Sequence, residues 1–122
     1  MEKFSFNYKN KKFEINIKKL SKLGMIFGLI FVRRKKAKAL LFDFQKPEKF
    51  SFTSLFVFFP FVILWLDKEN NVIDMKKIKA FQWHISSVKQ YYQVLEIPFN
   101  KDYFEILENL VGGSSGKTFK KN

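Results

Sequence analysis

A continuous apolar run from Leu55 to Leu66 constrains the fold more than any other feature of the chain. Its twelve residues carry no charge, contain Pro60 near the middle, and end at the polar segment 67–71. Such a run is buried either in lipid or inside a protein. A spanning helix needs about 20 apolar residues, and a proline within it would remove a hydrogen bond and kink it. Because Phe, Val and Ile favour strands, the run predicts two consecutive strands of a packed sheet.

The rest of the chain also argues against a membrane segment. The second apolar stretch, residues 23–32, is too short to span a bilayer and stops at Arg33. The first seventeen residues alternate between apolar and polar, whereas a signal peptide has a short charged start followed by an apolar core. We therefore expect a soluble, cytoplasmic protein without a membrane partner.

Length and composition indicate one ordinary domain without cofactor chemistry. The chain has 122 residues, enough for a single core. It contains no Cys, so neither a disulfide framework nor a thiolate metal site can form, and one His cannot build a histidine metal cluster. We expect no cofactor and no metal.

Two segments near the start alternate with a period of two. Residues 4–8 and 13–17 each place apolar side chains at every second position, and the segment between them is polar. This pattern predicts a β-hairpin with one face exposed to water. Tyr8 and Phe13 flank the turn, and we expect them to pair across it.

The later elements follow from the same signals. Residues 18–31 have helical spacing, although Gly24 and Gly28 weaken a helix. Asn100 is placed to cap a helix from Lys101 to about Leu110. Strands are expected at 39–44, 50–58, 61–66, 72–75 and 90–97, with turns at 45–49 and 67–71.

These elements define an α+β class that is mostly β. We expect a compact mixed sheet or a small barrel-like domain with two short helices over residues 1–111. Residues 112–122 have little to bury and form a basic tail that is expected to be disordered.

Several motifs in order resemble one family. The segment 27–33 is similar to a Gly-Leu-Met-Phe-Arg motif, and 39–44 to the Gly-Met-Leu-Phe-x-Phe strand that follows it. Residues 55–67, 72–73, 79–81 and 92–98 continue the series. Together they resemble the domain-of-unknown-function 192 family over residues 24 to about 110. The resemblance implies a compact, strand-rich α+β domain and no catalytic residues.

The chain departs from the family pattern at three places. Ala80 stands where the family usually has Pro, residues 99–100 replace a common Ala-Gly turn, and Gly112-Gly113 is followed by Ser where the family ends in Gly-Asp. If that ending has a function, this member lacks it.

Charge is unevenly distributed along the chain. The net charge is +12, of which +10 falls in residues 1–49. The basic residues are 21 Lys and 2 Arg, a bias that A/T-rich codon usage alone can produce. The segment with the densest positive charge is a candidate phosphate-contacting site or, alternatively, a solvated loop. Its candidate residues are Arg33, Arg34, Lys35, Lys36 and Lys38.

Few residues suggest chemistry. His84 is the only histidine, and with a carboxylate beside it could act as an acid–base pair. An exposed aromatic patch would mark a groove for a ligand or partner. The aromatic residues chosen as candidates for exposure are Phe50, Phe52, Trp83 and Tyr91.

The favoured function is a non-enzymatic binding or interaction domain, whose partner is a protein or a small ligand. The first alternative is a nucleic-acid-associated protein that uses the basic first third. The second is an enzyme with a site near His84. Neither catalytic residues nor a metal site are assigned.

Overall fold

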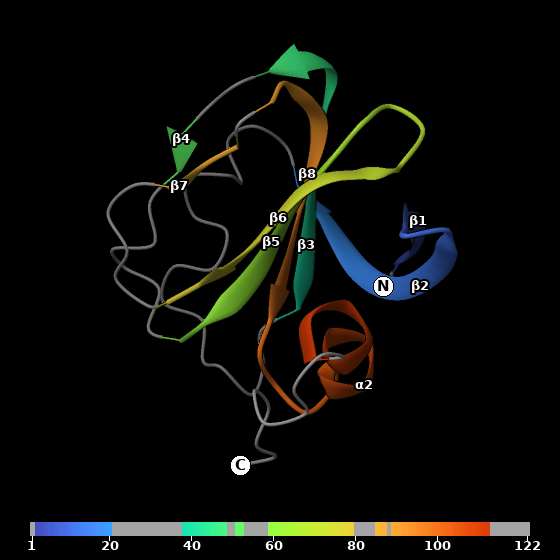
Figure 1. Ribbon diagram of the computed structural model, residues 1–122, viewed down its shortest axis with the longest axis vertical. Coiled ribbons are helices and arrows are strands. Elements are labelled where there is room, and N and C mark those ends of the chain that lie inside the picture. Colours follow the sequence, from blue (N-terminus) through green and yellow to red (C-terminus); the bar gives the residue numbers. More distant parts are fainter. Residues whose placement is uncertain are drawn as a thin grey trace.

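The computed structural model describes residues 2–20, 38–48, 51–52, 59–79, 85–87 and 89–112. Their main feature is a curled six-stranded sheet with the order β1-β2-β3-β8-β5-β6 (Figure 1). Neighbouring strands are antiparallel except β2 and β3, which are parallel, so the expected mixed sheet is confirmed. The strands are β1 (Glu2–Tyr8), β2 (Lys11–Leu20), β3 (Ala39–Glu48), β5 (Phe61–Leu66), β6 (Val72–Ile78) and β8 (Tyr91–Pro98).

Three smaller elements complete the described fold. A two-stranded sheet pairs β4 (Ser51–Phe52) with β7 (Ile85–Ser86). A short helix α2 (Phe104–Leu107) runs directly into a π-helical segment η2 (Glu108–Gly112). In Figure 1, β4 and β7 lie on one side of the large sheet and α2 lies on the other, beside β2. The predicted class, α+β and mostly β, is confirmed.

The two edges of the sheet meet at one point, which makes it barrel-like. Asn7 and Asn71 form an isolated parallel bridge between β1 and the start of β6. The backbone N–H of Asn7 donates to Asn70 O at 2.8 Å, and Asn7 Nδ2 donates to Asn71 Oδ1 at 3.1 Å. These bonds join strands that are far apart in the sheet order, so the sheet curls around an interior.

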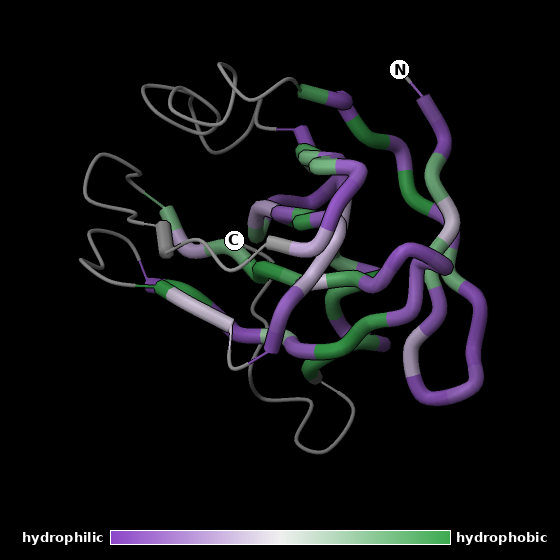
Figure 2. Tube along the Cα trace, turned by 90° about the horizontal axis from the view of Figure 1, so that it is seen from above, coloured by the Kyte–Doolittle hydropathy of each residue, from purple (hydrophilic) through white to green (hydrophobic). Residues whose placement is uncertain are grey.

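Each face of the sheet buries its own apolar cluster. The inner cluster combines alternate residues of the curled strands with Leu107 and Leu110 from the helical segment. The outer cluster lies on the central strands and includes Trp65, Tyr91 and Ile85. Figure 2 shows the underlying alternation of hydrophobic and hydrophilic residues along β1, the strand that begins at the N-terminus. β5 is buried on both faces, which explains its continuous apolar sequence.

The described part of the opening apolar run agrees with its prediction. Pro60 precedes β5, and all six residues of that strand are buried. Within the described ranges no helix has both the length and the apolar character of a membrane span. Residues 53–58, which complete the predicted strand 50–58, lie outside the described residues.

The first hairpin is confirmed, but its predicted register is wrong. Lys9 and Asn10 form a two-residue turn with φ of 50° and 64°, the left-handed backbone of a type I′ turn. This turn pairs Tyr8 with Lys11 and Phe6 with Phe13. The rings of Phe6 and Phe13 consequently stack with centroids 5.3 Å apart.

Three further predictions need correction. Residues 18–20 continue β2, because they pair with β3, and the rest of the expected 18–31 helix lies outside the described residues. Residues 45–48 remain in β3 through a bulge at which Gln45 has φ of 59°. Asn100 caps a turn by accepting from Asp102 N, so α2 begins only at Phe104.

Candidate ligand-binding site

An open cavity of about 470 Å³ lies at the end of the curled sheet where β3 and β8 meet the β5–β6 turn. We call it the mouth. Its lining comes from four strands and one turn, so the fold alone brings these residues together. The lining residues are Glu2, Phe4, Lys19, Leu41, Asp43, Gln45, Lys68, Asn70, Tyr92 and Gln93.

Gln93 and Asn70 hold the polar wall of the mouth in place. Gln93 is 7% exposed and lies opposite Asp43 in the β3–β8 pairing. Its Nε2 donates to Asn70 Oδ1 and, at 3.4 Å, to Asp67 O. Asn70 Nδ2 in turn donates to Ser5 O on β1 at 3.1 Å. A buried amide with these partners is fixed in orientation, which suits a wall that presents defined hydrogen-bonding groups.

The β5–β6 turn positions Asn70 through local bonds. Asp67 Oδ1 accepts the backbone N–H groups of Glu69 at 2.9 Å and Asn71 at 2.8 Å. Asn70 has φ of 66°, a left-handed conformation that Asn tolerates better than most residues. The predicted turn at 67–71 is therefore confirmed, and it places an amide at the rim.

The charges around the mouth are balanced and loosely paired. Lys19 Nζ lies 3.9 Å from Asp43 Oδ2, and the two side chains are 49% and 26% exposed. Asp43 Oδ1 also accepts Gln45 N at 2.9 Å. An exposed pair at this distance contributes little to stability, so both groups can exchange their partner for a ligand at small cost.

A second, smaller cavity adjoins the mouth. It has a volume of about 310 Å³ and lies at the place where β2 and β3 begin their parallel pairing. We call it the basic groove, because three of its five lining residues are lysines. The lining residues are Glu2, Ile17, Lys18, Lys19 and Lys38, of which Glu2 and Lys19 also line the mouth.

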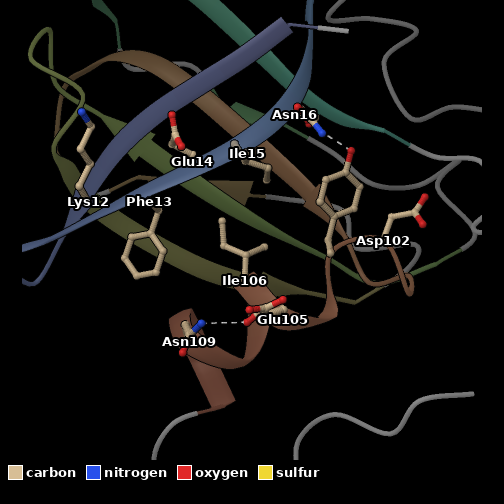
Figure 3. Close-up of a pocket in the computed structure, with 10 residues that line it drawn as sticks. Lys12, Phe13, Glu14, Ile15, Asn16, Asp102, Glu105, Ile106 and Asn109 are labelled. Carbon is tan, nitrogen blue, oxygen red and sulfur yellow. Dashed lines mark hydrogen bonds between the residues drawn. The ribbon is translucent and has the colours of Figure 1, made fainter.

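A third cavity, of about 400 Å³, separates β2 from the helical segment (Figure 3). Phe13 and Ile106 point toward one another across it, and Asn109 Nδ2 donates to Glu105 O at 3.1 Å (Figure 3). The Tyr103 hydroxyl fixes the seam between β2 and the helical segment. It donates to Asn16 O at 3.2 Å and accepts the backbone N–H of Ala39 at 2.9 Å. Burial raises the pKa of Tyr103, and the hydrogen bond from Ala39 opposes that rise.

Replacing Tyr103 with phenylalanine is expected to destabilise the fold by about 2 kcal/mol, because Ala39 N–H would lose its buried acceptor. Urea unfolding measures the change, with Tyr8→Phe at a half-buried position as the control. An equal effect of both substitutions would show that the Tyr103 hydroxyl contributes nothing specific.

Glu96 is a buried carboxyl group on the outer face of the sheet. It is 9% exposed and lies between Leu40 on β3 and Ile63 on β5. Desolvation by burial raises its pKa from 4.5 to about 7. Trp65 Nε1, on the same face, is buried without a hydrogen-bond partner within the described structure. These groups belong to a packed face and line none of the three cavities.

The residues chosen from the sequence are only partly described. Lys38 is exposed directly before β3 and lines the basic groove. Phe52 is a residue of β4, and its side chain is not described. The remaining candidates lie outside the described residues: Arg33, Arg34, Lys35, Lys36, Phe50, Trp83 and His84.

The choice of Tyr91 as an exposed aromatic is wrong. Tyr91 is 0% exposed and packs in the outer cluster, with its ring 5.8 Å from Phe44 and 6.4 Å from Trp65. The register shift between β3 and β8 places Tyr91 opposite Glu48, so strict alternation along β8 does not apply to it.

Sequence reasoning missed the mouth, although one signal for it existed. Gln93 lies on the side of β8 that carries Leu95 and Ile97, which are inner-cluster residues. A polar residue at an inward position requires partners. The identity of those partners, Asn70 and Asp67, depends on how the sheet curls.

The fold and the cavities define a strand-rich α+β protein whose curled mixed sheet is open at one end. The chain belongs to the DUF192 family (Uncharacterized ACR, COG1430), whose model matches residues 6–107. The match begins well before residue 24, so it includes most of the first hairpin. Curated proteins give no match.

Two solved structures share the fold. One is a protein from Sinorhizobium meliloti 1021 described as a putative transcription regulator, with a TM-score of 0.65 and 14% identity over 77% of this chain and 76% of that one. The other is a protein of unknown function from Novosphingobium aromaticivorans DSM 12444, with a TM-score of 0.64 and 13% identity over 77% and 69%. At these identities the likeness concerns the fold alone.

Proposed function

We propose that the protein is a non-enzymatic binding domain that takes a small ligand in the mouth. The observation that carries this proposal is the cavity itself. Its volume of about 470 Å³ falls within the range of about 300–1,000 Å³ that is usual for small-molecule sites. Leu41 and Phe4 supply apolar surface, while Gln93 and Asn70 supply oriented amides.

The chemistry of the lining favours binding over covalent catalysis. The ten lining residues offer two carboxylates, two ammonium groups, three amides and a phenol, together with Phe4 and Leu41. These groups form hydrogen bonds and ion pairs with a ligand. Among the described residues, the lining includes no Ser, Thr, Cys or His that would serve as an activated nucleophile or a base near neutral pH.

Replacing Tyr92 with alanine is expected to weaken ligand binding about tenfold or more, because it removes a half-buried aromatic wall of the mouth. The measurement is a thermal-shift and NMR screen of amino acids, sugars, nucleosides and their phosphates. Tyr8→Ala, a half-buried tyrosine that does not line the mouth, is the matched control. Equal affinity of both variants for every hit would contradict a ligand in the mouth.

Nucleic-acid association is the second candidate function. Six lysines of the first hairpin are exposed, at positions 3, 9, 11, 12, 18 and 19. In addition, one structure of the same fold is described as a putative transcription regulator. A backbone-binding mode predicts affinity for single-stranded oligonucleotides that falls steeply with salt. If fluorescence anisotropy detects no binding of single-stranded oligonucleotides at low salt, this candidate function is eliminated.

A further inference from the structure

The amide oxygen of Gln93 accepts no hydrogen bond from any residue that the structure describes. Gln93 lines the mouth and is 7% exposed. Its Nε2 donates to Asn70 Oδ1 and to Asp67 O, and these bonds use both protons of the amide nitrogen. A buried carbonyl oxygen normally has a donor. Gln93 Oε1 is therefore the atom of this side chain that is open to a hydrogen-bond donor on a ligand.

Strand pairing places the Asp43 carboxylate beside this amide. Asp43 on β3 lies directly opposite Gln93 on β8, and such pairs have Cβ atoms about 4.5–5.5 Å apart. Leu41 and Leu95, each two residues away on the same strands, belong to the inner cluster, so alternation places Asp43 and Gln93 on the inner face. Asp43 Oδ1 accepts Gln45 N. Asp43 Oδ2 and Gln93 Oε1 are consequently two neighbouring acceptors.

The Lys19 ammonium group completes a short polar row on the inner face. Ile15 and Ile17 belong to the inner cluster, so alternation along β2 places Lys19 on the same face. Lys19 Nζ lies 3.9 Å from Asp43 Oδ2, which is longer than a hydrogen bond. Across β2, β3 and β8 the row therefore presents an ammonium donor, a carboxylate acceptor and an amide acceptor.

We infer that the mouth binds a free α-amino acid with an apolar side chain. The ammonium group of the ligand donates to Asp43 Oδ2 and Gln93 Oε1, and its carboxylate accepts from Lys19 Nζ. The ligand side chain contacts Phe4 and Leu41, which supply apolar surface in the same cavity. This inference rests on the proposed function and deepens it, because it names the class of small molecule that the mouth takes.

The charge of the mouth favours a zwitterion over an ion of one sign. The lining carries two carboxylates and two ammonium groups, so its net charge is zero. An amine alone would leave Lys19 without a counter-ion, and a carboxylic acid alone would leave Asp43 without one. An amino acid supplies both charges side by side. Since the loose Lys19–Asp43 pair contributes little and charge-assisted hydrogen bonds are the stronger ones, the exchange of partners favours binding.

Isothermal titration calorimetry of the full chain with matched compounds tests the inference without any substitution. The amino acids are phenylalanine and leucine. Hydrocinnamate and isocaproate are the same molecules without the ammonium group, and phenethylamine and isopentylamine are the same molecules without the carboxylate. We expect each amino acid to bind at least about tenfold more tightly than its matched acid and its matched amine, because each of these lacks one set of charge-assisted bonds.

Asp43→Asn is the matched variant for the site. It keeps the shape of the side chain and an oxygen for Gln45 N, and it removes the charge that faces the ligand ammonium group. We expect it to bind phenylalanine about tenfold more weakly. Asp102→Asn, the control, removes the same charge at an exposed position outside the mouth and should leave binding unchanged. Urea unfolding checks that both variants fold, and the compound series decides the question independently of them.

The outcomes separate this inference from the proposed function. A preference for the amino acids that Asp43→Asn abolishes and Asp102→Asn retains supports the inference. A compound whose binding depends on Tyr92 but not on its ammonium group overturns the inference and leaves the mouth as a ligand site. Amino-acid binding that neither Asp43→Asn nor Tyr92→Ala weakens lies elsewhere and contradicts both. Absence of binding for the whole series overturns the inference alone, because the wider screen still tests the mouth.

Discussion

Replacing Glu96 with glutamine is expected to stabilise the protein by about 3 kcal/mol at about pH 8. The carboxyl group is buried between Leu40 and Ile63, and burial raises its pKa from 4.5 to about 7. Between these two values the unfolded chain releases the proton while the folded protein keeps it. The stability of the native protein therefore falls as pH rises from about 4.5 to about 7, and glutamine removes this loss.

Urea unfolding at several pH values measures this effect. The variant should match the native protein closely well below pH 4.5, where both the folded and the unfolded state hold the proton, and exceed it above pH 7. Glu105→Gln, at an exposed position of α2, is the control and should leave the pH profile as it is. A Glu96→Gln profile with the same slope as the native one would show that burial does not perturb this carboxyl group.

Replacing Leu107 with alanine is expected to destabilise the fold by about 3 kcal/mol, because it opens a cavity where the helical segment packs on the sheet. Leu107 is 0% exposed and lies in the inner cluster beside residues of β2 and β8. Tyr103, four residues earlier, ties the same segment to β2 and β3, so the loss should spread to those strands.

Chemical denaturation gives the size of this loss, and amide hydrogen exchange shows where it falls. Ile106→Ala is the matched control, since Ile106 is next in sequence but only partly buried. Ile106→Ala should lower the free energy of unfolding clearly less than Leu107→Ala does. If both substitutions cost the same, Leu107 is not the anchor of the helical segment.

The elements of this fold that sequence predicts are those set by local pattern. Residues 61–66 read as a strand because six apolar residues follow a proline, and the sheet buries both faces of β5. The hairpin follows from the alternation of residues 4–8 and 13–17. Register does not follow from alternation, since the two-residue turn at Lys9 and Asn10 moves Phe6, instead of Tyr8, opposite Phe13.

The remaining differences have long-range causes. Residues 18–20 have helical spacing but gain strand partners on β3, and pairing outweighs a weak local preference. Gln45 adopts a positive φ that keeps β3 paired past the expected turn. Neither effect is visible in the residues themselves.

The candidate site was less predictable than the fold. Its lining comes from β1, β2, β3, β8 and the β5–β6 turn, and only the curl of the sheet brings these together. Lys38, from the predicted basic run, lines the neighbouring groove together with Lys18 and Lys19 of β2, and its role as a site residue stays a prediction. The inward Gln93 was the one sequence signal that pointed to the mouth.

An NMR titration of the full chain with the best ligand from the small-molecule screen tests the central claim most directly. The account predicts amide shifts that concentrate on Asp43 and Gln93 at the mouth. Shifts confined to the seam between β2 and the helical segment, residues 12–16 and 102–109, would contradict it.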